Sequence, residues 1–194
     1  MSKVTEGKIY YFEKKGPGNT AKTLEIALDG CKSRGIRKIV VASATGETAL
    51  KLSRRAGDAL DIIAVTYGAG SRYREEVEAF NRNRPLLIRS GVQFVRGLHA
   101  LSGVERSFEG KYQSGLVPLN IVSDTLRLFS QGVKVCVEIS VMAAEQGLVS
   151  PDEDIVAIGG SGTGADTALV IKPAYAAHFF ETKIRAILCM PAES

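Results

Sequence analysis

Short, unbroken apolar runs separated by amphipathic segments are the feature that most constrains the fold. The runs at 39–42 (IVVA) and 62–65 (IIAV) are apolar at every position, and a segment with helical spacing at 46–57 joins them. A strand that is apolar on both sides has to be covered on both faces, which is typical of parallel sheets flanked by helices. The sequence therefore predicts an α/β fold, a three-layer sandwich with a mostly parallel sheet.

Helical spacing and turn residues place the other elements. A helix is predicted over 19–34, with Asn19 or Thr20 as N-cap and Gly35 as its stop. The charged segment 72–90 is also helical in tendency, and Pro85 is expected to begin a new helical turn there. A further helix is predicted over 119–131, and strands are predicted at 92–95, 155–158, 168–171 and 184–189. The segment 133–146 is ambiguous, because its β-branched residues favour a strand and its Met-Ala-Ala-Glu-Gln end favours a helix.

The stretch 97–118 shows no periodicity and is rich in Gly and Ser. Such a stretch in a small domain indicates either a functional loop or a wrong assignment of elements. With 194 residues the chain has the length of one domain, 1–194, so we interpret 97–118 as an insertion loop.

Composition excludes several classes of protein. Twenty-five Lys and Arg against 21 Asp and Glu give a formal charge of +4, which is compatible with an anionic ligand but too low for a nucleic-acid binder. Three separated cysteines and two histidines have no metal-ligand spacing, so no metal is expected. Neither a signal peptide nor an apolar run of membrane-spanning length is visible, so we expect no membrane partner and a cytoplasmic location.

The first candidate site joins a strand to a helix in the sequence VASATGETALKL, 41–52. Hydroxyl groups, a glycine and the free N–H groups of a helix N-terminus come together there, which suits a phosphate. The alternative is a plain helix start, with Thr45 as cap and Glu47 favourably placed in the first turn. The candidate ligand-binding residues are Ser43, Thr45, Gly46, Glu47 and Thr48.

The second candidate site is the sequence IGGSGTGADTA, 158–168. No helix follows it, which excludes a dinucleotide-binding fingerprint, and it lacks the Gly-Lys-Ser/Thr of a P-loop. A strand-to-strand loop with many accessible amides remains, either an anion nest or a turn that requires positive φ. Its candidate ligand-binding residues are Gly160, Ser161, Gly162, Thr163, Gly164 and Thr167. Both candidate loops follow carboxyl ends of predicted parallel strands, so we expect them to hold one phosphate group between them.

These two motifs together resemble the carboxyl-terminal α/β domain of pyruvate kinase. The whole chain is similar to the small stand-alone proteins, common in archaea, that consist only of this domain, through IYYFEK, VRGLHALSG and HFFETKIR. The resemblance implies a phosphorylated, nucleotide-like ligand, with flavin mononucleotide (FMN) as first candidate, a homo-oligomer, and a helix over 133–146. It implies no pyruvate kinase activity, because the chain is too short to include the catalytic barrel. The family's phosphate-binding role carries over to Ser43, Thr45, Gly46, Thr48, Ser161, Gly162 and Thr163.

Two departures from the kinase domain limit what carries over. Glu47 stands where effector-binding kinases often carry a basic residue, which argues against a doubly phosphorylated sugar. The insertion 97–118 has no clear counterpart in the kinase domain.

Aromatic and titratable residues outside the two loops are further candidates. Tyr67 and the segment 10–12 are able to stack on a flavin or a base, although such residues are more often core. His99 and Glu13 are the candidates for proton transfer if the chain is a flavin-dependent or phosphorylated-substrate enzyme. A regulatory or oligomerisation domain without ligand is the third alternative. Six arginines at 72, 74, 82, 84, 89 and 96 are interpreted as a solvated helix face rather than as an anion pocket or RNA-binding surface.

Overall fold

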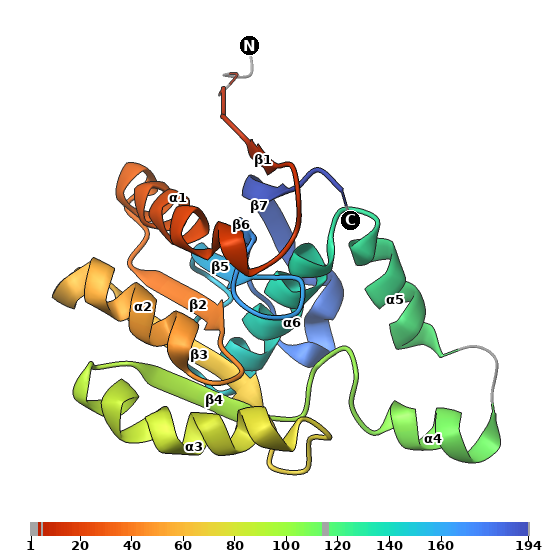
Figure 1. Cartoon of the computed structure of the whole chain (residues 1–194). Coiled ribbons are helices and arrows are strands. Elements are labelled where there is room, and N and C mark those ends of the chain that lie inside the picture. Colours follow the sequence, from red (N-terminus) through yellow and green to blue (C-terminus); the bar gives the residue numbers. More distant parts are fainter. Residues whose placement is uncertain (1–3, 5, 114–116, 194) are drawn as a thin grey trace.

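One seven-stranded sheet forms the centre of the molecule (Figure 1). The computed structural model describes residues 4, 6–113 and 117–193. The strands lie in the order β1 (Tyr10–Phe12), β7 (Lys183–Pro191), β6 (Thr167–Lys172), β5 (Ile155–Gly159), β2 (Lys38–Ala42), β3 (Asp61–Tyr67) and β4 (Gln93–Gly97). β6 is antiparallel to both its neighbours, and every other pairing is parallel. This confirms the α/β fold with a mostly parallel sheet.

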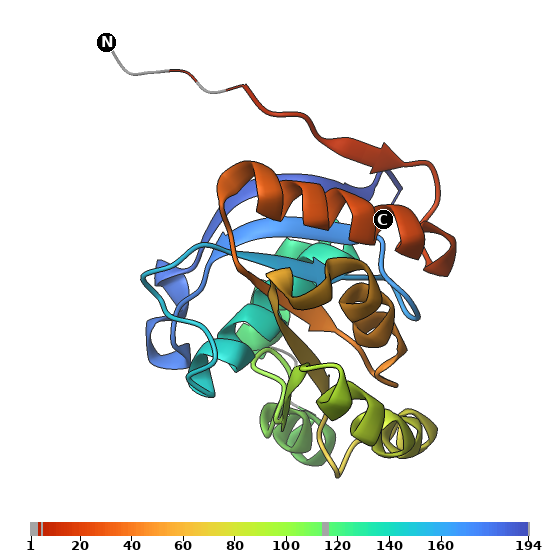
Figure 2. The same cartoon turned by 90° about the vertical axis from the view of Figure 1, so that its left-hand side faces the viewer.

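Helices cover both faces of the sheet, so the fold has three layers. α1 (Thr20–Arg34), α2 (Glu47–Ala56) and α3 (Arg74–Arg89) lie on one face, which Figure 2 views from the front. α6 (Gln131–Glu145) lies on the other face, with α5 (Pro118–Arg127) outside it. Successive strand residues point to opposite faces, so Val41 packs in the core under α1 to α3 and Val40 packs in the core under α6.

Burial explains why α6 forms from a sequence that also favours a strand. Twelve of its fifteen residues are buried between the sheet and α5. Ser130 caps the helix, since its Oγ accepts a hydrogen bond from the Val133 N–H at 3.1 Å. A helix that is enclosed on most sides is apolar nearly all round, and tertiary packing then outweighs the modest helix propensity of its valines and isoleucines. The helix that the family resemblance implied over 133–146 is confirmed, with its start two residues earlier.

The interpretation of 97–118 as a loop without structure is wrong for part of its length. Glu105–Tyr112 forms helix α4, although three residues of the stretch, 114–116, lie outside the described residues. None of the residues of α4 is buried, so packing against the core does not explain this helix. Its aromatic pair lies on one side one turn apart, with the ring centroids of Phe108 and Tyr112 6.0 Å from each other.

Two further elements differ from the sequence-based predictions. Tyr10–Phe12 forms the edge strand β1 beside β7, which the sequence did not predict, and Phe12 packs against the core. A strand of three residues is too short to give a periodic pattern, and its pairing partner lies at the far end of the chain. Pro85 does not begin a new helical turn, since α3 continues through it from Arg74 to Arg89. No helix of the described part of the chain has both the length and the apolar character that a membrane span requires.

Candidate functional site: a basic cleft at the ends of two strands

The chain moves from one face of the sheet to the other after β4. After β3 it turns to α3 on one face, and after β4 it passes through α4 and α5 to α6 on the other face. In open α/β sheets the crevice at such a point, outside the carboxyl ends of the strands, is the usual ligand site. A cleft of about 800 Å³ lies there, between the segments 67–73 and 96–103 on one side and the start of α6 on the other.

The wall of this cleft is strongly basic. Five basic side chains line it against one acidic residue, Glu138. They come from five separate parts of the chain, namely the loop after β3, strand β4 and helices α4, α5 and α6. Such an excess of one charge in a concave surface attracts an anion and raises its local concentration. The five are Arg72, Arg96, Arg106, Arg127 and Lys134.

Three stacked aromatic rings form part of the same wall. Tyr67, the last residue of β3, stacks on Tyr73 with ring centroids 4.8 Å apart and on His99 with centroids 5.4 Å apart. Burial raises the pKa of Tyr67, so its hydroxyl stays protonated. Flat aromatic side chains favour a ligand with a flat ring, because offset stacking adds to the area that is buried.

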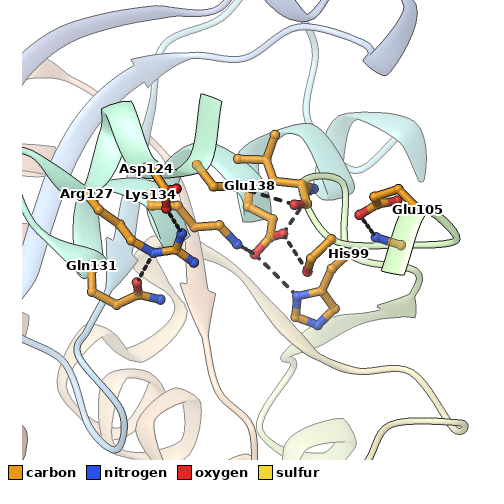
Figure 3. A network of polar contacts seen from close by, with 11 residues as sticks. His99, Glu105, Asp124, Arg127, Gln131, Lys134 and Glu138 are labelled. Carbon is orange, nitrogen blue, oxygen red and sulfur yellow. Dashed lines mark hydrogen bonds and ion pairs between the residues drawn. The ribbon is translucent and has the colours of Figure 1, made fainter. Parts of the chain in front are cut away.

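Glu138 is the centre of a network of polar contacts beneath the cleft (Figure 3). Its Oε2 accepts a hydrogen bond from Lys134 Nζ at 2.7 Å and lies 3.3 Å from His99 Nδ1. Its Oε1 accepts a hydrogen bond from the Leu101 N–H at 3.0 Å. Both Lys134 and Glu138 are buried, so α6 carries an ion pair into the protein interior. The pair anchors the segment after β4 to α6 and thereby fixes one side of the cleft.

The charge of Glu138 is maintained by its neighbours. Burial by itself raises the pKa of the carboxyl group, but the hydrogen bond from His99 and the positive charge of Lys134 outweigh it and lower the pKa to about 2. The carboxylate is thus ionised at neutral pH and acts only as a hydrogen-bond acceptor. His99 therefore donates through Nδ1 to Glu138.

Acid is expected to destabilise the protein through this carboxyl group. A pKa of about 2 in the folded state, against 4.5 for the free side chain, gives stability that is complete above about pH 4.5 and is lost as the pH falls toward 2. The loss corresponds to a free energy of unfolding on the order of 3 kcal/mol. Urea unfolding from pH 6 to about pH 2.5 measures it, with Glu138→Gln as the control that lacks the titration. Equal acid sensitivity in the two proteins would contradict the prediction.

The predicted loop 43–48 lies at the carboxyl end of β2, next to β3. Its buried Ser43 accepts a hydrogen bond through Oγ from the Ala49 N–H at 3.2 Å, and Thr45 Oγ1 accepts one from the Glu47 N–H at 3.4 Å. Gly46 has φ +88°, a backbone conformation that favours glycine, and a Cβ on it would lie 3.1 Å from Leu87, so the glycine has a structural reason without a ligand. The Thr45 hydroxyl therefore contributes to the helix start, and the half-buried Thr48 lies in the first turn of α2.

The predicted loop 160–167 is held largely by the protein itself. Asp166 is fully buried and accepts hydrogen bonds from the N–H groups of Gly16 and Ser161 at 2.9 and 3.2 Å. Thr20 Oγ1 accepts another from the Ala165 N–H at 3.0 Å, and the buried Thr167 hydroxyl donates to Asp166 at 2.9 Å. The loop thus ties the start of α1 to the sheet, which uses several of the amides that the anion-nest prediction counted.

Contacts and backbone conformation explain two glycines of this second loop, Gly160 and Gly164, without a ligand. A Cβ on Gly160 would lie 2.7 Å from the Gly164 carbonyl oxygen, and Gly164 itself has φ +76°. Gly162 and Thr163 are exposed, and Ser161 is half-buried. These three residues are the part of the loop that faces outward.

The two loops lie at the same end of the sheet, where neighbouring parallel strands have their carboxyl ends. They leave β2 and β5, which pair in parallel with Val41 opposite Ile158. The Thr66 hydroxyl donates to the Ala44 carbonyl oxygen at 2.9 Å, which connects the first loop to the end of β3 and so to the cleft. The cleft wall itself, however, includes Tyr67 and His99 of the predicted site residues and none from either loop.

Sequence reasoning missed most of the charged residues of the cleft. Arg72 and Arg96 were interpreted as part of a solvated helix face, although both line the cleft. The spacing of Lys134 and Glu138, four residues apart within an apolar run, is the signal that points to a buried ion pair once the segment is read as a helix. Glu13 is exposed and follows β1, at the opposite edge of the sheet from β4. Among the described residues no three His, Cys, Asp or Glu side chains cluster as metal ligands.

Comparison with known proteins gives one family match and several similar solved structures. A pyruvate kinase from Cryptosporidium parvum is 17% identical, with 83% of this chain and 24% of that chain covered and a TM-score of 0.42. An NH3-dependent NAD synthetase from Campylobacter jejuni is 12% identical, with 75% and 56% covered and a TM-score of 0.41. This chain spans about a quarter of the kinase chain. The family pattern described as pyruvate kinase, alpha/beta domain matches residues 21–171, which is most of the sequence, and the chain therefore belongs to that family.

Proposed function

We propose that this chain binds a phosphorylated small molecule with a flat aromatic ring in the basic cleft, and that FMN is the first candidate. The excess of five basic side chains over one acidic side chain on the cleft wall is the observation that carries the proposal. A phosphate group suits arginine because the guanidinium group donates two parallel hydrogen bonds to it. The flavin as the ring comes from the family resemblance.

Size and position support a ligand of this class. A volume of about 800 Å³ is within the range of small-molecule sites, and the aromatic stack of Tyr67, Tyr73 and His99 offers a flat surface for a ring. The half-buried Thr45 and Thr48 of loop 43–48 lie at the carboxyl end of the neighbouring strand β2. We therefore propose that the arginines of the cleft bind the phosphate. The contribution of Thr45 and Thr48 is tested with separate variants.

Titration of the purified chain with FMN, followed by flavin fluorescence and calorimetry, is the direct test. The double variant Arg96→Ala/Arg127→Ala is expected to bind FMN at least about 100-fold more weakly, since charge-assisted hydrogen bonds contribute about 1.5–3 kcal/mol each. Riboflavin, which has the ring without the phosphate, is expected to bind at least about tenfold more weakly than FMN for the same reason. Arg82→Ala/Arg89→Ala, two exposed arginines of α3 outside the cleft, is the matched control.

The variants also locate the phosphate. Loss of FMN affinity in Thr45→Ala/Thr48→Ala with retention in the arginine pair would place the phosphate at the loop rather than in the cleft. Unchanged affinity in the threonine pair rules that loop out of the site. Failure of the wild-type chain to bind either FMN or inorganic phosphate would overturn the proposed function.

A further inference from the structure

The buried Nε2 of His99 has no hydrogen-bond partner among the described residues. The opposite ring nitrogen, Nδ1, faces Glu138, so the ring is fixed with Nε2 on the side away from the carboxylate (Figure 3). Since the ionised carboxylate only accepts hydrogen bonds, Nδ1 carries a proton, and in the neutral ring Nε2 is an unprotonated acceptor. Polar atoms that are shielded from water are nearly always paired, so an orphaned atom on a cleft wall points to a missing partner.

Charges around the ring decide whether Nε2 takes a second proton. Glu138 places a negative charge beside Nδ1, and the basic side chains of the cleft wall place positive charges around the site. Lys134 and Arg127 are each paired with a carboxylate, at 2.7 Å from Glu138 and from Asp124 respectively. No acid pairs with Arg96 or Arg106 among the described ion pairs. The titratable and charged groups that face the site from its walls are Tyr67, Arg72, Tyr73, Arg96, Arg106, Arg127, Lys134 and Glu138.

We propose that His99 takes up a proton at Nε2 when an anionic phosphate ligand enters the cleft, so that ligand binding and protonation are coupled. The ligand's negative charge compensates the arginines, which removes the repulsion that opposes the imidazolium ion, and the new N–H donates to the ligand. The proton comes from the solvent, and no bond of the ligand is broken. The inference rests on the proposed function, because it requires that an anion bind in this cleft.

Coupling of this kind has a defined consequence for affinity. If binding takes up a proton, affinity must rise as the pH falls through the range in which an imidazole titrates. If one proton is taken up per ligand, the affinity rises by at most about tenfold for each pH unit. A phosphate monoester loses its own second proton near about pH 6, so measurements are made at about pH 7.5, where the ligand is already dianionic.

Calorimetry of FMN binding in two buffers with different enthalpies of ionisation measures the protons taken up. We expect net uptake by the wild-type chain at about pH 7.5, with a value of up to one proton per FMN. His99→Gln retains a donor group but has no titrating nitrogen, so its uptake is expected to vanish. His178→Gln removes the other histidine, whose side chain is 63% exposed, and is expected to leave the uptake unchanged.

Imidazole ¹⁵N chemical shifts test the same step without a variant. In the free protein His99 is expected to give one protonated nitrogen, Nδ1, and in complexes with FMN or inorganic phosphate two protonated nitrogens. Binding of FMN with no proton uptake and with unchanged shifts would overturn the inference and leave the proposed function intact. Absence of any binding would overturn the proposed function and the inference together, and uptake that survives His99→Gln would overturn the inference alone.

Discussion

Replacement of Glu138 by leucine is expected to lower the free energy of unfolding by about 3–5 kcal/mol, because it leaves the buried ammonium group of Lys134 without a counter-charge. The same change removes the acceptor of the Leu101 N–H, which is bonded at 3.0 Å to Oε1. Urea unfolding monitored by circular dichroism measures the loss. Few single changes in this chain remove as many partners at once.

The double variant Lys134→Met/Glu138→Leu separates the charge from the packing. Since no buried charge then lacks a partner, it is expected to be more stable than Glu138→Leu, with a remaining loss of about 1–3 kcal/mol for the unpaired Leu101 N–H. A double variant as unstable as the single one would show that the ion pair is not the source of the effect. Arg127→Ala, which removes an exposed ion pair with Asp124, is the control and is expected to change stability by less than about 1 kcal/mol.

Truncation of Phe80 to alanine is expected to have a similar effect, a loss of about 3–5 kcal/mol of unfolding free energy. Phe80 is a fully buried residue of α3, and its ring meets that of Phe94 edge to face with centroids 5.6 Å apart. The alanine leaves a cavity whose lining loses contacts on one side. Its loss also removes the ring on which the guanidinium group of Arg96 lies, 5.3 Å from the centroid.

Thermal and urea unfolding measure the loss of unfolding free energy in Phe80→Ala, with Phe180→Ala as the control. Phe180 is 83% exposed, so its truncation is expected to change the free energy of unfolding by less than about 0.5 kcal/mol. Because Arg96 lies over Phe80, the core variant is also expected to weaken FMN binding if it still folds. Equal stability of the two variants would contradict the position of Phe80 in the core.

Local patterns were sufficient to predict the fold, because each central strand is visible in the sequence as an unbroken apolar run. The apolar runs at 39–42 and 62–65 need no knowledge of their partners, and β2 and β3 do pair residue for residue, with Ile39 opposite Ile62. The positions of the two Gly-rich loops followed from the same reasoning. Their glycines, however, were interpreted as an approach for a ligand, whereas the positive φ of Gly46 and Gly164 and the contact of Gly160 with Gly164 already account for three of them.

The cleft was harder to predict because its walls are a product of tertiary structure. Arg96, Arg127 and Lys134 belong to a strand and two helices that meet only in the folded protein. Lys134 and Glu138 come together only if their segment is a helix, and composition left that choice open. Tyr67 and His99 were accessible to prediction, because one ends a recognised strand and the other is one of only two histidines.

The pairing of β1 with β7 joins the two ends of the chain, since Tyr10 lies opposite Cys189. Closing a loop of that length costs chain entropy that a three-residue strand repays poorly. We expect this edge to form late during folding, since β7 is the last strand of the sheet in chain order, and to open early when the native state fluctuates. The sheet is thus least protected against amide hydrogen exchange where its first and last strands meet.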